Sequence, residues 1–335
     1  MNAGARCVGK VVADEFTYSL DGESQFFGTP LNPKIPDRIL GGSSSGSASS
    51  VACGLADFSL CTDAGGSIRV PASFCGIWGM RPSLHRISEA GVLPFMPSVS
   101  TVGAVATNLD IMNRAMRVLL RSSSRPTAKL RRIVLLDDAF KLADELVREA
   151  AEIEIERLSK RTGIMHERAS FADIVGWDTD LTVCNGAALR KLQTAEFQST
   201  VGDWIEHHKP ELGFVFSLAY ENVKSFDRST AVRSIDLCER LFESIGRFLQ
   251  PGVVVCFPTT PTVAPLKGSL NTMEAVSDFY DRTMAVTSFS GAGRLPEISA
   301  PLLSVGSCPV GLSIVAGHYQ DEFLLGATHD MFIET

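Results

Sequence analysis

The chain has 335 residues, of which 45% are hydrophobic and 21% charged, and its formal net charge is −7. A chain of this length can bury a large core, and no segment looks like a linker between two cores, so one domain spanning residues 1–335 is expected. The basic residues are scattered, which argues against a nucleic-acid partner. No segment resembles a signal peptide or has the roughly 18 apolar residues of a membrane span. We therefore expect a soluble, cytoplasmic protein without a membrane partner.

The cysteines and histidines give no sign of a metal or a disulfide framework. The eight cysteines show no CxxC pairing, and several lie in apolar runs such as GVVVCFP. That usage is typical of reduced, buried cysteines in a cytosolic protein. The six histidines have no metal-ligand spacing, and the adjacent His207 and His208 would diverge on a helix. Neither a metal nor a cofactor is expected.

The first part of the chain leads toward a serine-rich block. The segment AGARCVGKVVADEFTYS predicts a short strand that runs into a turn, and SLDGESQFFGTPLNPKIPDRIL predicts a long loop. After Ser45, the small residues from Gly46 to Gly54 suit a closely packed helix. FSLCTD then predicts a buried strand ending at Asp63, so Ser67 is expected at a strand-to-turn junction.

The rest of the chain alternates helical and strand patterns. Asn108 or Asp110 can start a helix, and RRIVLLDD predicts a buried, parallel-type strand. Residues 139–161 predict one long helix with Leu142, Leu146 and Ala150 on one face. Further helices are expected at 186–208, 226–249 and 320–333, and strands at 252–257, 297–304 and 309–316. This order predicts an α/β sandwich with a mixed central sheet.

Residues 41–83 contain two serines that each follow a glycine pair, Ser43 and Ser67, 24 positions apart. Glycines before a serine allow a tight turn that leaves the hydroxyl uncrowded beside unpaired backbone N–H groups. A flexible Gly/Ser linker is the alternative, but the apolar run VACGLADFSL follows at once and would be buried. A phosphate loop is also disfavoured, because no Gly-Lys-Ser/Thr follows.

GGSSSGS, followed by TDAGGSIRVPASFCG and GMRPS, closely resembles the amidase signature family. AGARCVGKVVADEF, PTTPTVAP, PEISAPLL and CPVGLSIVAGHYQDEFLL resemble other family segments, so the likeness spans nearly the whole chain. YSLDGES, FGTPLNP and residues 186–250 look most like plant indole-3-acetamide hydrolases and related chloroplast-receptor amidase domains. The resemblance implies an α/β/α domain around a mixed sheet.

The resemblance also implies a catalytic scheme of serine, cis-serine and lysine. Ser67 at the end of DAGGS matches the nucleophile, and Ser43 matches the bridging serine that follows a cis peptide bond. An alcohol is a poor nucleophile until a base removes its proton, and the amine leaving group must be protonated. Because a hydroxyl both donates and accepts, Ser43 could carry the proton in either direction.

The negative oxygen of the tetrahedral intermediate needs fixed donors. The expected donors are the backbone N–H groups of the nucleophile turn, namely Ala64, Gly65, Gly66 and Ser67. Ser44 and the flanking pair Asp63 and Arg69 are expected to support the site; the alternative for the pair is a surface ion pair of little energetic value.

In this family the catalytic lysine lies a few tens of residues before the AGA segment. Here Met1 stands directly before that segment, so this sequence is expected to lack the lysine and the family's N-terminal elements. Lys10 is the nearest alternative, but it matches a different family position and suits a structural role. Hydrolysis by this chain alone should therefore be weak, and exposed apolar surface should favour a homo-oligomer.

Three functions remain open. The first is an amide hydrolase that acts on a small-molecule carboxamide through an acyl-enzyme on Ser67. The second is a non-catalytic, amidase-like binding module, and the third is an amidotransferase subunit with an ammonia-supplying partner. Phe95 and Met96 in VLPFMP either line the pocket or belong to the core, and the sequence assigns neither.

Overall fold

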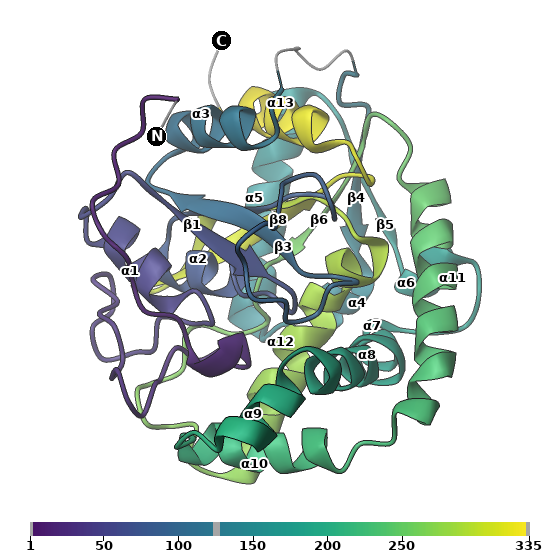
Figure 1. Cartoon of the computed structure of the whole chain (residues 1–335). Coiled ribbons are helices and arrows are strands. Elements are labelled where there is room, and N and C mark those ends of the chain that lie inside the picture. The colour runs from purple at the N-terminus through teal and green to yellow at the C-terminus, as the bar shows by residue number, and fades with distance from the viewer. Residues whose placement is uncertain (1–2, 123–127, 333–335) are drawn as a thin grey trace.

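A computed structural model describes residues 3–122 and 128–332 and contains one mixed sheet of eight strands (Figure 1). The order across the sheet is β1-β3-β2-β7-β8-β6-β4-β5. The strands are β1 (Phe58–Asp63), β2 (Trp78–Arg81), β3 (Thr101–Ala106), β4 (Arg132–Leu136), β5 (His166–Ala169), β6 (Val253–Pro258), β7 (Glu297–Val305) and β8 (Cys308–Val315).

The sheet is antiparallel on one side and partly parallel on the other. β1, β3, β2, β7, β8 and β6 pair antiparallel in turn, whereas β4 lies parallel to both β6 and β5. β6 is buried at all six positions, as expected for an apolar strand covered on both faces. β5 is an edge strand with the sequence His-Glu-Arg-Ala, and its two middle residues are exposed, which is why its sequence gives no strand signal.

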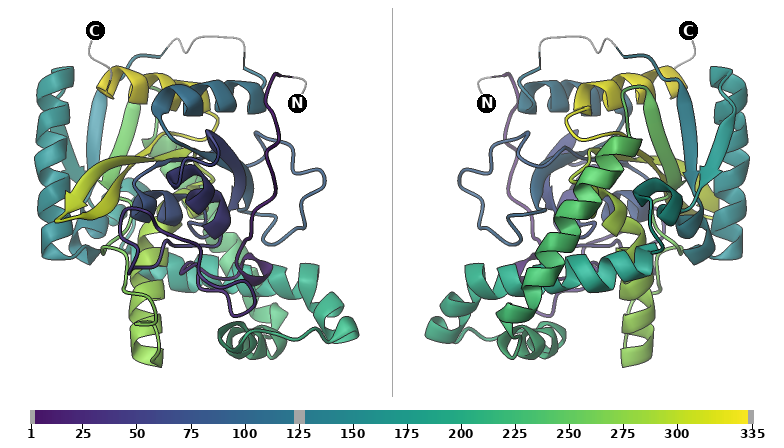
Figure 2. Two further views of the ribbon diagram at one scale, coloured as in Figure 1. Left: turned by 90° about the vertical axis from the view of Figure 1, so that its left-hand side faces the viewer. Right: turned by 90° about the vertical axis from the view of Figure 1, so that its right-hand side faces the viewer.

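Helices cover both faces, which confirms the predicted α/β/α arrangement. The helices are α1 (Ser45–Ala52), α2 (Arg69–Cys75), α3 (Leu109–Leu119), α4 (Asp137–Leu142), α5 (Glu145–Thr162), α6 (Phe171–Val175), α7 (Leu181–Val183), α8 (Arg190–Phe197), α9 (Asp203–His208), α10 (Phe214–Lys224), α11 (Val232–Phe248), α12 (Met273–Gly293) and α13 (Asp321–Phe332). α3, α5 and α13 pack on one face (Figure 2). α1, α2 and α4 contact the other, where α12 packs against α4 (Figures 1 and 2).

Three local predictions were wrong. FSLCTD forms β1 but not a buried strand, because β1 lies at the sheet edge and only Asp63 in it is fully buried. The segment before the serine block forms no strand; it runs as an irregular chain into a 3₁₀ turn at Glu15–Thr17. The helix expected at 139–161 is two helices, because the chain is extended at Ala143 and Asp144 N–H donates to Pro261 O at 2.8 Å. The buried face of α5 includes Ile155, while Leu146 is 60% exposed.

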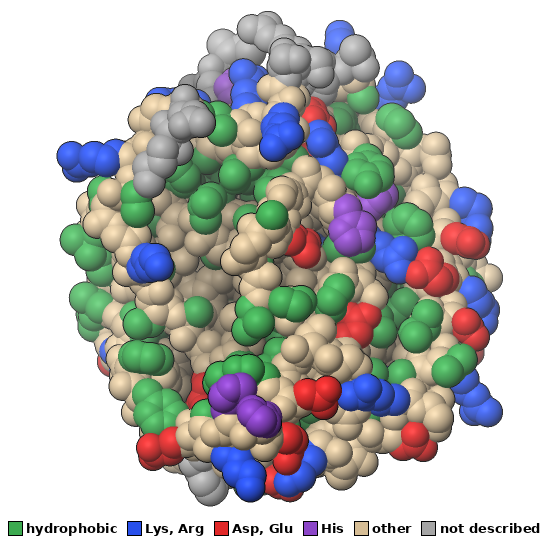
Figure 3. Space-filling view, in the orientation of Figure 1, with side chains coloured by type: hydrophobic (Ala, Val, Ile, Leu, Met, Phe, Trp, Pro, Cys, Tyr) green, Lys and Arg blue, Asp and Glu red, His purple; other side chains and the backbone are tan. Residues whose placement is uncertain are grey.

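Surface charge, helix composition and the grouping of metal-ligating side chains are three further features of the described residues. On the face shown in Figure 3, basic and acidic side chains are interspersed rather than gathered in one stripe. Within residues 3–122 and 128–332, no helix has both the length and the apolar character needed to cross a bilayer. Over the same residues, no three His, Cys, Asp or Glu side chains lie together as a metal site would require.

Candidate functional site

The predicted nucleophile lies in a turn between β1 and α2. β1 ends at Asp63 and α2 begins at Arg69, so the Gly-Gly-Ser sequence occupies the connection. Gly66 has a φ of 122°, a conformation that residues with a side chain rarely adopt. Ser67 is buried, with 6% of its surface exposed, and its hydroxyl makes no hydrogen bond to any described residue. The turn therefore presents a hydroxyl that is not engaged in structural bonding.

Asp63 holds this turn in place. Its carboxylate accepts hydrogen bonds from the backbone N–H groups of Gly66 at 3.2 Å and Ile68 at 2.9 Å. The Arg69 side chain donates to both carboxylate oxygens, from Nε at 3.0 Å and from a terminal nitrogen at 2.8 Å. Such a bidentate pair fixes geometry as well as charge. Asp63 thus sets the backbone conformation on which Ser67 depends.

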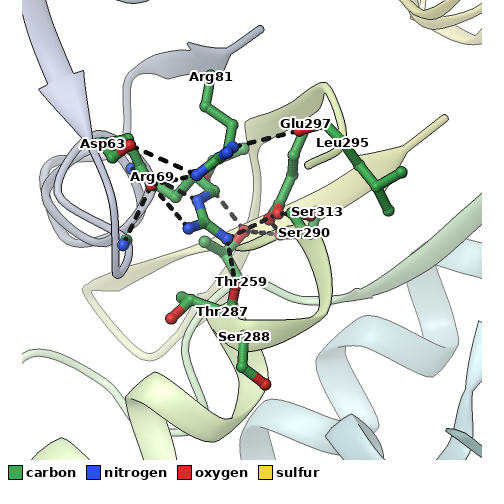
Figure 4. Close-up of polar contacts among 12 residues, drawn as sticks. Asp63, Arg69, Arg81, Thr259, Thr287, Ser288, Ser290, Leu295, Glu297 and Ser313 are labelled. Atoms are coloured by element: carbon green, nitrogen blue, oxygen red, sulfur yellow. Dashed lines mark hydrogen bonds and ion pairs between the residues drawn. The ribbon is translucent and has the colours of Figure 1, made fainter. Parts of the chain in front are cut away.

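The Asp63–Arg69 pair belongs to a buried network of four charges (Figure 4). Arg69 also contacts Glu297 at 2.8 Å, and Arg81 contacts Asp63 at 3.1 Å. These side chains are at most 1% exposed, so the alternative of a surface ion pair was wrong. Burial alone would raise the pKa of Asp63, but the charges of Arg69 and Arg81 hold it well below its usual range. The carboxylate is therefore an anion at all ordinary pH values.

Ser43 lies beside the nucleophile turn. A cis peptide bond joins Gly42 to Ser43, and the N–H of Ser44 donates to the carbonyl oxygen of Ser67 at 3.3 Å. The Ser43 hydroxyl is buried and has no hydrogen-bond partner among the described residues. Ser44 donates its hydroxyl to Thr62 O at 3.2 Å, which fastens this segment to β1. The structure thus places the two predicted serines on adjacent, hydrogen-bonded turns.

The four backbone donors predicted for the oxyanion are not equivalent. The N–H of Gly66 already donates to Asp63. Those of Ala64, Gly65 and Ser67 make no hydrogen bond within the described part of the chain. Three N–H groups therefore remain for a developing negative charge.

Asp14 packs on the other side of the Ser43 turn, and sequence reasoning missed it. Its N–H donates to Ser43 O at 2.9 Å, and its carboxyl accepts from Gly22 N at 3.1 Å and from the Ser19 hydroxyl. A Cβ on Gly42 would lie 1.9 Å from Asp14 Oδ2, so only glycine fits there. Burial, reinforced by the nearby charge of Asp21, raises the pKa of Asp14 to about 7. No pattern near Asp14 in the sequence predicts its contact with Gly42, which lies 28 positions later.

A cavity of about 10 Å³ adjoins the nucleophile turn. It is enclosed by the turn, a loop after β2 and two helical segments, and no charged side chain lines it. The lining residues are Ala64, Gly65, Met96, Val99, Asn185, Leu189, Gln193, Met284, Thr287 and Ser288. Met96 therefore lines the cavity, whereas Phe95 packs against Tyr18 and Phe197, with ring centroids 5.7 and 5.4 Å away.

Lys10, the nearest lysine considered in the sequence analysis, has an exposed side chain.

The cavity's helical wall was also missed at the sequence level. Asn185, Leu189 and Gln193 recur at every fourth position, which places them along one side of a helical segment. That spacing was the available signal. The spacing alone does not predict a cavity wall, because the segment lines the cavity only where the fold places it against Ala64 and Gly65, more than 100 positions earlier in the chain.

The mixed sheet and the two adjacent serine turns define an α/β class of protein, and the comparisons with known proteins identify the family. A family model described as Amidase matches residues 1–155. Amidase 1 of Arabidopsis thaliana is 32% identical over 97% of this chain and 81% of that protein. The translocon at the outer membrane of chloroplasts 64 of Pisum sativum is 30% identical over 99% of this chain, which spans 59% of that protein. The chain belongs to the amidase signature family.

A solved structure supports the same fold. A crystal structure of an amidase superposes with a TM-score of 0.84 at 23% sequence identity, covering 95% of this chain and 72% of the other. The mixed eight-stranded sheet is therefore the amidase fold.

Proposed function

We propose that this chain hydrolyses a small carboxamide through an acyl-enzyme on Ser67. The hydrogen bond from Ser44 N to Ser67 O carries the proposal, because it joins the two serine turns beside unengaged backbone N–H groups. A nucleophile, a second hydroxyl and an oxyanion site on adjacent turns are the groups that acyl transfer needs. The family membership supports the same reaction class.

In the proposed reaction, Ser67 Oγ attacks the amide carbon and passes its proton to Ser43 Oγ, while Ser43 gives up its own proton to a general base; no described residue is bonded to Ser43 Oγ in that role. The carbonyl oxygen becomes an oxyanion held by the free N–H groups of the nucleophile turn. The C–N bond then breaks as Ser43 gives a proton to the departing amine and takes one back from the base. Water hydrolyses the ester by the same route in reverse, which releases the acid and restores the Ser67 hydroxyl.

The test is covalent labelling with a fluorophosphonate, read by peptide mass spectrometry, together with ammonia release from a panel of primary amides. Ser67→Ala should abolish both signals, and Ser43→Ala should slow both by about 100-fold or more. Ser304→Ala is the matched control, because Ser304 is exposed on β7, and it should behave like the wild type. Labelling that persists in Ser67→Ala would refute the proposal.

A second function, an amidase-like binding module without catalysis, has one specific observation in its favour. The Ser43 hydroxyl contacts no acid or base among the described residues, so the chain shows no partner that would deprotonate it. The module predicts amide binding by calorimetry with neither Ser67 labelling nor ammonia release. The hydrolase predicts all three.

A further inference from the structure

We propose that Asn185 determines substrate specificity by accepting a hydrogen bond from a neutral O–H or N–H group on the acyl part of the substrate. This inference rests on the proposed function, because it places the acyl group in the cavity beside the Ser67 turn. It adds a recognition element in a segment far along the chain from both serines.

The side-chain oxygen of Asn185 is buried without a hydrogen-bond donor among the described residues. Asn185 is 4% exposed, and its Oδ1 atom is buried with no hydrogen-bond partner in the described part of the chain. An unpaired buried acceptor destabilises the fold, and most buried polar groups in folded proteins are hydrogen-bonded. A ligand donor would satisfy it.

The two hydroxyl groups that α12 contributes to the cavity are already paired. The Thr287 hydroxyl donates to Gly65 O at 2.7 Å, and the Ser288 hydroxyl donates to Ala285 O at 2.6 Å. These bonds hold α12 against the nucleophile turn and need no ligand. Asn185 differs from these two hydroxyls, because its Oδ1 atom is buried without a partner.

The backbone around Asn185 is also unusual. Asn185 lies in a π-helical segment, Cys184–Leu189, between α7 and α8. Such segments are rare and occur frequently at functional sites, because the wider turn redirects side chains. This segment packs on α12 and lines the cavity together with Ala64 and Gly65. Asn185 thus lines the same cavity as the turn that contains Ser67.

The remaining lining defines the chemical class of the acyl group. Met96, Val99, Leu189 and Met284 form apolar walls, and no charged side chain lines the cavity. A charged acyl group would lose its hydration there without gaining a counterion. The cavity of about 10 Å³ holds about one water or one donor group. Methionine side chains are adaptable, so Met96 and Met284 can move to admit an apolar frame.

The experiment measures binding by calorimetry in the Ser67→Ala background, which prevents turnover. The probes are phenylacetamide and its ortho-, meta- and para-hydroxy derivatives. At least one hydroxy isomer should bind about tenfold more tightly than phenylacetamide, the effect of one good hydrogen bond. Adding Asn185→Leu should reduce that preference to about onefold while leaving the affinity for phenylacetamide within about threefold.

Asn185→Ala provides a second variant in case leucine disturbs packing, and both should show wild-type circular dichroism. Asn222→Leu, at an exposed position on α10, is the matched control and should keep the tenfold preference. The inference is overturned if no isomer binds more tightly than phenylacetamide, or if both Asn185 variants keep the preference. Failure of the proposed function itself would appear separately, as absence of fluorophosphonate labelling at Ser67.

Discussion

The two serine turns are each braced by a buried aspartate, yet the two carboxyl groups are held in opposite states. Asp63, beside Ser67, contacts two guanidinium groups and three backbone N–H groups, and its pKa is depressed despite complete burial. Asp14, beside Ser43, contacts hydroxyls and one N–H and lies near Asp21, and burial raises its pKa to about 7. Burial alone therefore does not set charge; the partners decide it.

The contrast separates two kinds of support. The Asp63 network is fixed and neutral overall, with two acidic and two basic side chains, so it keeps the nucleophile turn rigid at any moderate pH. Near the Ser43 turn, the pKa of Asp14 is raised to about 7, and the Ser43 hydroxyl has no hydrogen-bond partner among the described residues. If the proposed reaction holds, the Ser43 turn would take part in proton transfer, and the Ser67 turn would hold the geometry.

Asp63→Ala should give the largest effect. It leaves Arg69 and Arg81 buried with only Glu297 as a counterion, and breaking a buried pair in this way typically costs about 3–5 kcal/mol. Urea unfolding followed by circular dichroism measures the loss. Glu167→Ala is the matched control, because its pair with Arg132 has side chains about half exposed, 52% and 48%, and should cost under about 1 kcal/mol. Equal losses in the two variants would contradict the assigned role of the network.

Asp14→Asn should change how stability depends on pH. With a folded pKa of about 7 against an ordinary 3.8, the folded state binds the extra proton between these values, so wild-type stability should fall as pH rises from about 4 to 7. Asparagine stays neutral, so the variant should gain on the order of 4 kcal/mol over the wild type by pH 8, and almost nothing at pH 3.5. Chemical unfolding across this range checks it. If the stability difference between Asp14→Asn and the wild type does not vary with pH, the pKa of Asp14 is not raised in the folded protein.

Gly66→Ala should weaken the rigid turn by a smaller amount. Its φ of 122° disfavours alanine, and the new Cβ would meet Thr287 Cγ2 at 3.0 Å. We expect a loss of about 2 kcal/mol and at least tenfold slower fluorophosphonate labelling of Ser67. Gly246→Ala, with open space around it in α11, should instead be neutral or stabilising by up to about 1 kcal/mol. Unchanged labelling in Gly66→Ala would show that the turn tolerates movement.

Ser44→Ala should give the smallest effect, because it removes the hydroxyl that bonds Thr62 O and keeps the backbone bond from Ser44 N to Ser67 O. A loss of about 1 kcal/mol in thermal or chemical unfolding is expected, with the labelling rate of Ser67 within about twofold of the wild type. A larger fall in labelling than in stability would give Ser44 a direct part in the chemistry.

Sequence reasoning predicted much of the frame, since long apolar runs and helix caps act locally. β4, β6, β7 and β8 follow apolar runs, and Asn108 caps α3 by accepting from Ile111 N at 2.9 Å as expected. β5 was missed because an edge strand can be polar. The single helix at 139–161 was wrong because a tertiary bond to Pro261 O interrupts it.

The site divides in the same way. Ser43 and Ser67 could be named because the glycines that shape their turns stand next to them in the chain. Asp14 and Asn185 could not, since each has its role only through a contact with a distant turn. Local patterns predict the candidate reacting groups, and tertiary packing supplies their surroundings.

The most direct test of the central claim is a crystal structure of the chain after fluorophosphonate treatment. The account predicts phosphorus bonded to Ser67 Oγ, a phosphoryl oxygen about 2.7–3.1 Å from backbone nitrogens of the nucleophile turn, and Ser43 Oγ within hydrogen-bond reach of Ser67 Oγ. An adduct on another residue, or a Ser43 hydroxyl directed away from Ser67, would contradict it.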